Sequence, residues 1–575
     1  MFLFHIFRSF LPLENPLGFG AADFIELGLA ALLVAAILLR PRLEPDFRRL
    51  AERTGWSMAL AALFPVAARL LLLGKSAVPV PGSADGFSYV LLADTLRHFR
   101  LANPTHPMHR FFEALFVLQE PAYASIYPAG QGIALALGRA LFGHPWAGVL
   151  LSIAAFCGLC YWMLRGWTTP AWSLAGALLA GIEFGPLNQW TNTYWGGGVS
   201  ATAGCLVFGA LPRLRQEARP RNAALLGLGI GLQLLTRPFE FLLLLAAVAL
   251  YALAVRWPIR AAAKPALIAA LAFLPAAGLT LLQNHAVTRS WTTIPYQLSR
   301  YQYGVPTTFT IQPIPVPHRE LTPIQMRTYE GQSAVHGEGT DTPATWLERL
   351  GYRLRFYRFF FLAPLYAALP FFLWRLREPR LAWVVAALAI FAIGTNFYPY
   401  FFQHYLAAVA CLTVLASVTA LETLSRVKFR GWPAGREAAL LIVLLCAAHF
   451  LFFYGVRFFG DDATVRSVAR YEGWDYINLG DAEGRRAVQR RLDQIPGPLL
   501  VFVRYEPNHM FQEWIHNDAD IDAARIVYAD DLGDTENETL LDYYPSRSAW
   551  LLEPDALPPR LEPYRPQRIE LLPIH

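Results

Sequence analysis

The arrangement of charge along the chain constrains its fold more than any other feature. Arg and Lys residues gather in short polar stretches between about a dozen apolar segments, most of them long enough to cross a bilayer as a helix. The predicted spans lie near residues 20–39, 56–74, 146–164, 168–187, 198–212, 222–236, 238–255, 265–284, 357–374, 381–397, 403–421 and 437–456. We therefore expect a mainly α-helical, polytopic membrane protein with about 12 transmembrane helices.

The basic stretches also predict how these spans are oriented. The stretches richest in Arg and Lys are 40–55, 213–221, 256–264, 375–380 and 426–436. They share one side of the membrane if the spans alternate, and the positive-inside rule makes that side cytoplasmic. The segments expected on the opposite side are both termini, the short loops 188–197 and 398–402, which hold no Arg or Lys, and the long segments 75–145, 286–356 and 457–575.

Composition excludes several other classes of protein. Hydrophobic residues make up 55% of the chain and charged residues only 16%, whereas a soluble protein carries about a quarter charged residues. The net charge of +6 does not indicate a nucleic-acid partner, because membrane orientation accounts for the basic stretches. The cysteines all lie in apolar segments, so no disulfide framework is expected.

Two shorter helices are expected on the outer side. Counting segment 129–143 as a span would move every later basic stretch outside, so we predict a helix that lies at the surface or re-enters the membrane. Residues 87–100 predict a second surface helix. Its apolar face carries Tyr89, Leu92, Leu96 and Phe99, while Asp94, Arg97 and His98 face elsewhere.

The chain changes character near residue 460, where charged residues become frequent and apolar runs become short. Segments 498–505, 524–529 and 548–553 predict strands, and 483–493 and 534–543 predict helices. We therefore expect a transmembrane domain, residues 1–456, with outer loops 75–145 and 286–356, followed by a small outer α/β domain, residues 457–575.

The first outer loop carries the most specific motifs. Asp85 opens it, and Tyr127-Pro128-Ala129-Gly130-Gln131-Gly132 leads into a helix that ends near Leu141-Phe142-Gly143. This pattern resembles the GT-C glycosyltransferases, and most of all the branch with protein O-mannosyltransferases and aminoarabinose transferases. The resemblance covers roughly residues 56–425, and its short motifs indicate a superfamily rather than a substrate.

The resemblance implies that Asp85 is a general base on the acceptor hydroxyl, or that it helps to hold a divalent metal. A hydroxyl that attacks an anomeric carbon needs a proton acceptor within hydrogen-bond reach, and a lipid phosphate is a good leaving group. A structural role is the alternative, in which Asp85 caps the helix that begins near Gly86.

This chain departs from the family where a second acidic residue is often found. Gly86 follows Asp85, and the loop 188–197 has no carboxylate, which puts a two-carboxylate metal site in doubt and leaves the metal requirement open. Glu183, near the end of a span, either reaches the site or bonds a neighbouring helix. Asn192 and the aromatic residues of loop 188–197 suit sugar binding or form an interfacial belt.

The donor phosphate needs cationic partners at the outer membrane edge. Arg237 is the lone basic residue between two spans on that side, and it binds either a phosphate or Glu240. His404-Tyr405 stands where the family often has Arg-Tyr. Further candidates for substrate or metal contacts, or simply polar loop residues, are His106, His109 and Glu113.

The sequence thus predicts a glycosyltransferase of the bacterial inner membrane. The predicted reaction moves a sugar from a polyprenyl-phosphate donor to a glycan, lipid or protein acceptor at the periplasmic face. A transporter or lipid flippase is the main alternative, against which the large outer segments and the lack of recognisable inverted halves argue. A non-catalytic membrane scaffold is the third possibility.

The predicted orientation can be tested with reporter fusions. We expect a reporter that works only outside the cytoplasm to be active at the C-terminus and inactive within 213–221, because the basic stretches are retained on the inner side. A C-terminal fusion that is active only in the cytoplasm would contradict this orientation and the outer placement of Asp85.

Overall fold

The computed structural model describes residues 21–337, 341–460, 465, 482–509 and 511–565. These residues fall into two compact units. Unit 1 comprises the described residues within Met1–Val78, Trp146–Leu279 and Thr342–Ile477, and unit 2 those within Pro79–Pro145, Thr280–Asp341 and Asn478–His575. The predicted location of the N-terminus concerns residues 1–20, and the predicted junction near 457 leads into 461–464 and 466–481; these residues lie outside the described ranges.

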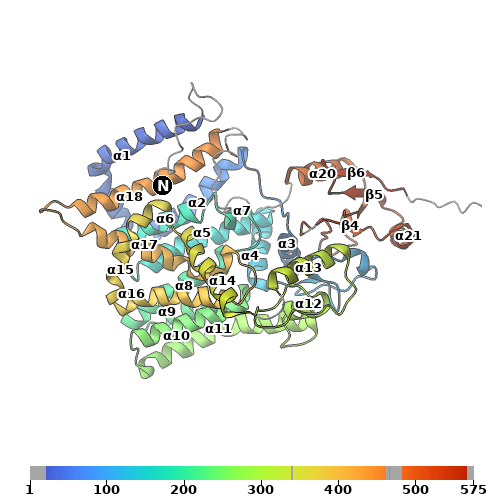
Figure 1. Cartoon of the computed structure of the whole chain (residues 1–575), viewed down its shortest axis with the longest axis horizontal. Helices are drawn as coiled ribbons and strands as arrows, with labels where there is room; N and C mark the ends of the chain where they lie inside the picture. Colours follow the sequence, from blue (N-terminus) through green and yellow to red (C-terminus); the bar gives the residue numbers. More distant parts are fainter. Residues whose placement is uncertain (1–20, 338–340, 461–464, 466–481, 510, 566–575) are drawn as a thin grey trace, which may run out of the picture. The chain divides into compact units, whose positions relative to one another are not determined.

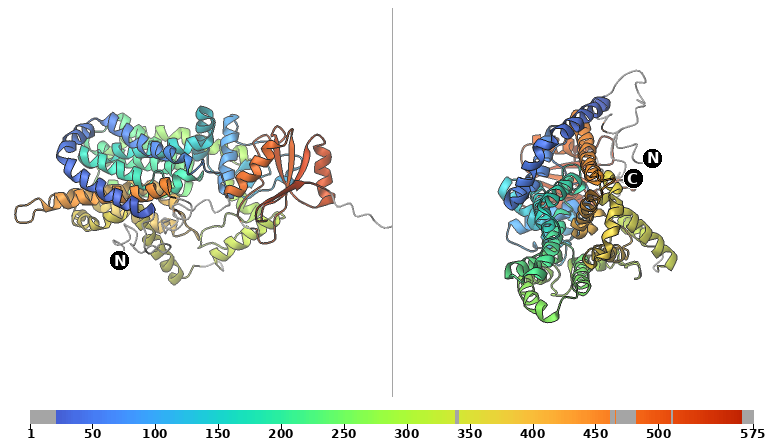
Figure 2. Two further views of the ribbon diagram at one scale, coloured as in Figure 1. Left: turned by 90° about the horizontal axis from the view of Figure 1, so that it is seen from above. Right: turned by 90° about the vertical axis from the view of Figure 1, so that its left-hand side faces the viewer.

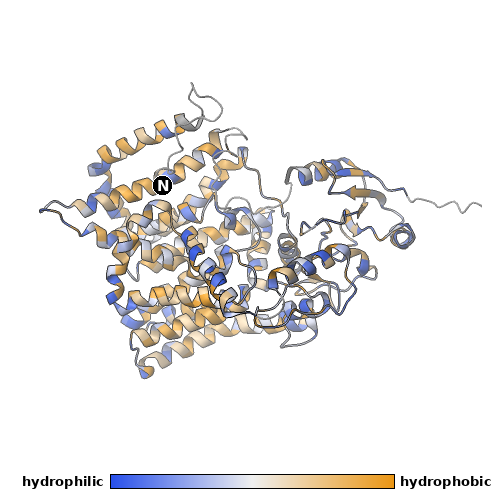
Figure 3. Cartoon of the chain, viewed as in Figure 1, coloured by the Kyte–Doolittle hydropathy of each residue, from blue (hydrophilic) through white to orange (hydrophobic). Residues whose placement is uncertain are grey.

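Unit 1 is built from apolar helices (Figures 1 and 3). Its helices are α1 (Ala21–Glu52), α2 (Thr54–Leu71), α5 (Pro145–Leu164), α6 (Pro170–Glu183), α7 (Gln189–Asn192), α8 (Gly198–Gln216), α9 (Pro220–Thr236), α10 (Pro238–Ala254), α11 (Ile259–Thr288), α14 (Pro343–Phe356), α15 (Leu369–Trp374), α16 (Pro379–Thr395), α17 (Ala410–Ser425) and α18 (Ala434–Phe459). The last part of α11, from Thr280, belongs to unit 2. Several begin with Pro, which lacks the N–H that the first turn would leave unbonded.

Within the described residues, six helical stretches are long and apolar enough to cross a membrane, which makes the chain a multi-pass membrane protein. They are Phe24–Glu52, Thr54–Gly74, Pro145–Leu164, Ile259–Thr288, Gln403–Ser425 and Ala434–Phe459. Two shorter apolar helices are Pro238–Ala254 and Pro379–Thr395. The other spans of the expected set of about 12 stay a prediction.

The predicted span 357–374 is wrong as a single helix. The structure has two short 3₁₀ helices, Tyr357–Phe360 and Ala363–Ala367, followed by α15. Pro364 and Pro370 lack backbone N–H donors and interrupt the helical hydrogen-bond pattern.

The basic stretch 40–55, expected to lie as a loop between two predicted spans, is mostly helical, because α1 continues to Glu52 with Pro41 and Pro45 inside it. Arg48 donates to Glu44 at 2.8 Å, one helical turn away, and Arg436 reaches the same carboxylate at 2.5 Å. These ion pairs favour the helical conformation over a solvated loop.

Helices α5, α8 and α17 form the buried centre of unit 1. Small residues allow the closest approaches, as expected for helices that associate within a membrane. The clearest case is Gly204 of α8, which faces the 3₁₀ helix Gln403–Val409. A Cβ atom at Gly204 would lie 1.9 Å from the backbone oxygen of Ala408.

Unit 2 contains both helices that the sequence predicted for the first outer loop, α3 (Ala84–Arg97) and α4 (Ala129–Phe142). They pack on each other where Leu92 and Leu96 meet Gly132. The predicted helix 87–100 is too long at its end, because α3 stops at Arg97; Phe99 lies beyond it and is fully exposed, while Asp94 is buried. Asp94 can be buried because Arg139 of α4, at 3.2 Å, neutralises it.

The remaining elements of the loops in unit 2 are short. They are the 3₁₀ helix His109–Phe112, the antiparallel pair β1 (Val117–Leu118) and β2 (Ala124–Ser125), and helices α12 (Pro295–Tyr303) and α13 (Pro323–His336).

The C-terminal module, defined here as residues 482–565, has the predicted α/β pattern. Its elements are α20 (Ala482–Gln494), β3 (Leu499–Val503), β4 (Ile526–Asp530), α21 (Asp534–Tyr543), β5 (Ser548–Glu553) and β6 (Arg560–Pro563). The strand order is β4-β3-β5-β6, with β3 parallel to β4 and β5, and β6 antiparallel to β5. The predicted strands and helices are confirmed, and β6 is an addition.

Strand β3 is buried on both faces, which explains its unbroken apolar sequence. Leu499, Val501 and Val503 face Val488 and Leu492 of α20. Leu500 and Phe502 face the cluster that contains Leu540 of α21. The two helices therefore cover opposite faces of the sheet (Figure 2).

The close approach at Gly204 generates a stability prediction. Gly204→Ala should lower the free energy of unfolding by roughly 1–3 kcal/mol, because the added methyl group has no room beside Ala408. Gly278→Ala is the matched control in α11, since a Cβ there meets nothing within 4 Å. Thermal unfolding of both variants in detergent measures the difference, and equal stability would contradict the packing argument.

Candidate functional site

Asp85 lies in the first turn of α3, near the start of the segment 75–145 that the sequence predicts as the first outer loop. Ser83 is the N-cap, and its hydroxyl accepts a hydrogen bond from the Gly86 N–H at 3.4 Å. The capping role that the sequence left open for Asp85 therefore belongs to Ser83. A carboxylate in the first helical turn is still favoured by the helix dipole.

The side chain of Asp85 meets the second motif of the loop. The Tyr127 hydroxyl donates a hydrogen bond to Asp85 Oδ1, although the two residues are 42 positions apart. Burial raises the pKa of Tyr127 well above its ordinary value, with the Asp85 carboxylate adding to the shift. Tyr127 therefore keeps its proton and acts as the donor in this bond.

Aromatic rings surround Tyr127. Its ring stacks on that of Tyr89 of α3, with the ring centres 4.1 Å apart, and meets the Tyr296 ring edge to face, with the centres 5.5 Å apart. Gln283 donates to the backbone oxygen of Tyr127 at 2.9 Å. Tyr296 belongs to the long segment 286–356, so this second outer segment contributes to the surroundings of Asp85.

Glu113 is buried in a separate network. Its carboxylate accepts hydrogen bonds from Arg319 at 2.6 Å, from Tyr303 at 2.9 Å and from Gln325 at 3.1 Å. His109 lies beside the same arginine, 3.2 Å from it. This network joins segment 286–356 to the first outer loop, which favours a structural role for both predicted candidates.

His106 contacts the C-terminal module. Its Nε2 lies 3.1 Å from an Asp522 carboxylate oxygen, which also accepts from the Tyr544 hydroxyl at 2.6 Å. These hydrogen bonds outweigh desolvation and hold the pKa of Asp522 below its ordinary value. The position of His106 indicates an anchor for the loop.

In unit 1, the three residues predicted to bind the donor phosphate lie together. The Arg237 guanidinium lies over the Tyr405 ring, 4.5 Å from its centre, and the His404 and Tyr405 rings are 4.9 Å apart. Arg237 also makes an ion pair with Glu240 at 3.2 Å. The competing partner foreseen in the sequence is therefore present beside Arg237.

Asn192 and Glu183 also belong to unit 1. Asn192 accepts a hydrogen bond from Arg69 at 2.8 Å, and it donates to the backbone oxygens of Pro186 and Asn188. Glu183 is buried at the end of α6. The hydrogen bonds of Asn192 shape the loop between α6 and α8.

Sequence reasoning overlooked Arg69, which is 2% exposed. Its guanidinium donates to the backbone oxygens of Ser76 and Ala77 and lies over the Trp146 ring, 4.8 Å from its centre. An arginine inside an apolar span was the available signal, because such a charge requires specific partners.

The candidates thus separate between the two units. Asp85, His106, His109 and Glu113 belong to unit 2, whereas unit 1 holds Arg237, His404, Tyr405, Glu183 and Asn192. Among the described residues, no three His, Cys, Asp or Glu side chains are arranged to hold a metal ion. That Asp85, Arg237 and His404 act in one site at the outer membrane edge stays a prediction.

No protein-family model and no curated protein matches the chain. Among solved structures, an oligosaccharyltransferase from Archaeoglobus fulgidus in complex with Zn and sulfate aligns with a TM-score of 0.46 and 13% identity, covering 86% of this chain and 67% of that one. ArnT from Cupriavidus metallidurans in the apo state aligns with a TM-score of 0.45 and 14% identity, covering 87% and 93%. Matches this distant leave the function to be argued from the chain's own residues.

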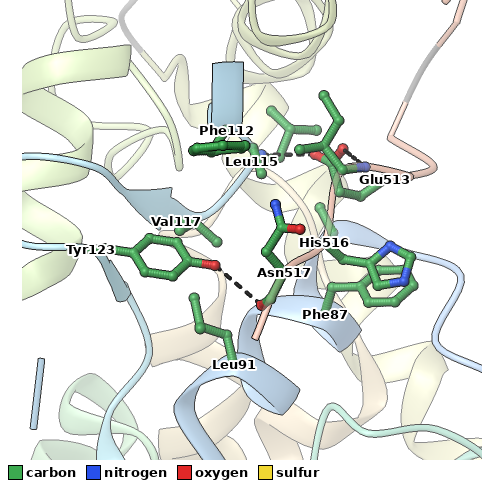
Figure 4. A pocket seen from close by; sticks show the side chains of 12 residues that line it. Phe87, Leu91, Phe112, Leu115, Val117, Tyr123, Glu513, His516 and Asn517 are labelled. Carbon is green, nitrogen blue, oxygen red and sulfur yellow. Dashed lines mark hydrogen bonds between the residues drawn. The ribbon is translucent and has the colours of Figure 1, made fainter. Parts of the chain in front are cut away.

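His516 of the C-terminal module packs on Phe87, which follows Asp85 by two residues in α3. The His516 ring lies between Phe87 of α3, at 4.1 Å, and Tyr528 of β4, at 4.5 Å (Figure 4 shows Phe87 and His516). Loss of hydration and the nearby Arg485 charge lower the pKa of His516 to about 3. His516 is therefore neutral in the folded protein at neutral pH.

Stability should consequently fall with acidification below pH 6.5. Between about pH 6.5 and pH 3, His516 is protonated in the unfolded chain but not in the folded chain. Each pH unit of acidification in this range therefore lowers the free energy of unfolding by at most about 1.4 kcal/mol. His516→Phe keeps an aromatic ring in the stack and should make the melting temperature less sensitive to acid. An identical loss of melting temperature in both proteins between pH 6.5 and pH 4.5 would contradict this assignment.

Proposed function

We propose that this protein is an integral-membrane glycosyltransferase of the GT-C type. The observation that carries the proposal is the hydrogen bond between Asp85 and Tyr127. These residues belong to the two motifs on which the sequence resemblance rests, and both belong to the first outer loop. An acidic residue next to a helix start and a surrounding group of tyrosines suits a hydroxyl acceptor and a sugar.

In the proposed reaction, the oxygen of the acceptor hydroxyl attacks the anomeric carbon while Asp85 takes the proton of that hydroxyl. The bond from this carbon to the phosphate oxygen breaks, and the lipid phosphate leaves with the electron pair. Direct displacement of this kind inverts the anomeric carbon. The Tyr127 hydroxyl donates to one oxygen of Asp85 and so limits the rotation of the carboxylate.

Arg237, His404 and Tyr405 form the proposed site for the donor phosphate. A guanidinium can give a phosphate two parallel hydrogen bonds, and its placement on the Tyr405 ring limits its rotation. Glu240 holds Arg237 at 3.2 Å, so donor binding has to compete with this ion pair.

The proposed donor is a polyprenyl-phosphate sugar, and the proposed location is the periplasmic face of the bacterial inner membrane. The orientation predicted from the basic stretches supports this side of the membrane. The acceptor is a glycan, lipid or protein. A divalent metal near Asp85 would need further ligands, and the described residues do not supply a three-ligand group, so we assign no step to a metal.

Two substitutions separate the proposed roles. Asp85→Asn should slow transfer about 10²- to 10⁴-fold and leave donor binding nearly unchanged, because it removes the base and little else. Arg237→Ala should weaken donor binding about 10- to 100-fold, because it removes a charged partner of the phosphate. Transfer is measured from a panel of undecaprenyl-phosphate hexoses and aminoarabinose, and binding is measured with undecaprenyl phosphate.

Asp520→Asn is the control for the loss of one carboxylate, since Asp520 is exposed in the C-terminal module and should not affect either measurement. Transfer by the Asp85→Asn variant at the wild-type rate would place the base elsewhere. Unchanged transfer and binding in both variants would contradict the proposal and favour the transporter alternative.

A further inference from the structure

Residues 511–519 of the C-terminal module run along helix α3, which carries Asp85 in its first turn. At the start of α3, the Ala84 N–H donates to the backbone oxygen of Phe511 at 3.3 Å. At its other end, the Ala519 N–H donates to the Asp94 carboxylate at 2.9 Å. The segment 511–519 is therefore attached at both ends of the helix, and all of these residues belong to unit 2.

Arg485 of α20 strengthens the attachment next to Asp85. Its guanidinium donates to the backbone oxygen of Gly82 at 3.3 Å and to that of Glu513 at 2.5 Å. It also lies over the Phe87 ring, 5.1 Å from the ring centre. Arg485 is 6% exposed, so these contacts form away from solvent and hold the residues on both sides of Asp85.

Glu513 attaches the segment 511–519 to the first outer loop. Its buried carboxylate accepts from the Leu115 N–H at 2.9 Å and from the Tyr505 hydroxyl at 2.8 Å. Phe116, which follows Leu115 in the chain, accepts a hydrogen bond through its backbone oxygen from the Ser88 hydroxyl of α3 at 2.7 Å. One carboxylate thus ties the first outer loop to the module where the loop contacts α3.

Little empty space remains at this contact. The cavity between α3, the first outer loop and residues 513–517 measures about 20 Å³, room for about one water molecule (Figure 4). Phe87, Tyr123 and Asn517 line it, and the Tyr123 hydroxyl donates to the Asn517 backbone oxygen at 3.2 Å. A shift of the segment would therefore be transmitted to α3, because packed side chains cannot absorb it.

We propose that Arg485 and the segment 511–519 set the position of Asp85, which makes the C-terminal module a positioning element of the active site. This inference rests on the proposed function, in which Asp85 is the base. The module contacts the chain at Gly82, Ala84 and Phe87, on both sides of Asp85. A displacement of about 1 Å at a reacting group can cost about 100-fold in rate.

A double-mutant cycle distinguishes this positioning role from a purely structural role of the module. Arg485→Ala should lower kcat about 10- to 100-fold while KM for the donor stays unchanged. In the Asp85→Asn background the same change should cost no further rate, since a positioning residue acts only through the group that it positions. Each rate is measured on the full-length protein with undecaprenyl-phosphate mannose and the other members of the donor panel.

Arg525→Ala is the matched control. Arg525 also belongs to the module and donates to backbone oxygens, those of Leu492 and Ile495, and its ion pair is with Asp493 of α20. It should leave kcat unchanged. Phe87→Leu is the milder second variant in case Arg485→Ala does not fold, because it removes the ring stack and keeps an apolar side chain.

A labelling experiment tests the positioning without any substrate. The native cysteines are buried, so Asp85→Cys offers a maleimide one accessible thiol among the described residues. Arg485→Ala in this background should speed labelling at least about fivefold by loosening the first turn of α3, whereas Arg525→Ala should not.

The outcomes distinguish the two proposals. Independent, multiplicative losses from Arg485→Ala and Asp85→Asn, or an unchanged labelling rate, would overturn the positioning role and leave the proposed function standing. A wild-type transfer rate in the Asp85→Asn variant would overturn the proposed function and the positioning of a catalytic carboxylate together.

Discussion

The hydrogen bond from Tyr127 to Asp85 is the interaction on which the candidate site depends. It joins the start of α3 to the residue that precedes α4, and the same Tyr127 ring carries the stack with Tyr89 and the contact with Tyr296. Without it, the two motifs of the first outer loop would be separate features of the chain. With it, an acidic side chain is held at a fixed place within a group of tyrosines.

Charge compensation decides which polar residues are free to act on a substrate. Burying a charge without a partner costs several kcal/mol, so each buried charge in such a protein has to be matched. Glu113 is matched by Arg319, and Arg69 by Asn192 and two backbone oxygens. Glu113 and Arg69 therefore stabilise the segments that they join, and the proposed role in catalysis falls to Asp85.

The C-terminal module acts on the same region through backbone contacts. Its mixed sheet is covered by helices on both faces, so the segment 511–519 extends from a folded support. A carboxylate that has to meet a reacting hydroxyl needs such support, because loops alone leave its position variable. Under the proposed function, this offers a physical reason for an α/β module of the soluble type in this membrane protein.

Local patterns in the sequence determined most of the helices and strands. The apolar segments predicted the helices of unit 1, and the short apolar runs after residue 480 predicted β3, β4 and β5, because both signals depend on neighbouring residues. The motif that begins at Tyr127 and the position of Asp85 were also recognised from the sequence, as was Glu240 as a partner of Arg237.

Only the tertiary structure decided which distant residues meet. The Glu113–Arg319 pair joins residues 206 positions apart, and Arg485 reaches Gly82 across 403 positions. The same holds for Asp94, whose burial depends on Arg139 and on the Ala519 N–H. Hydrogen bonds and ion pairs of this kind act over a few ångströms in space, and no periodicity along the chain records which segments folding will bring within that distance.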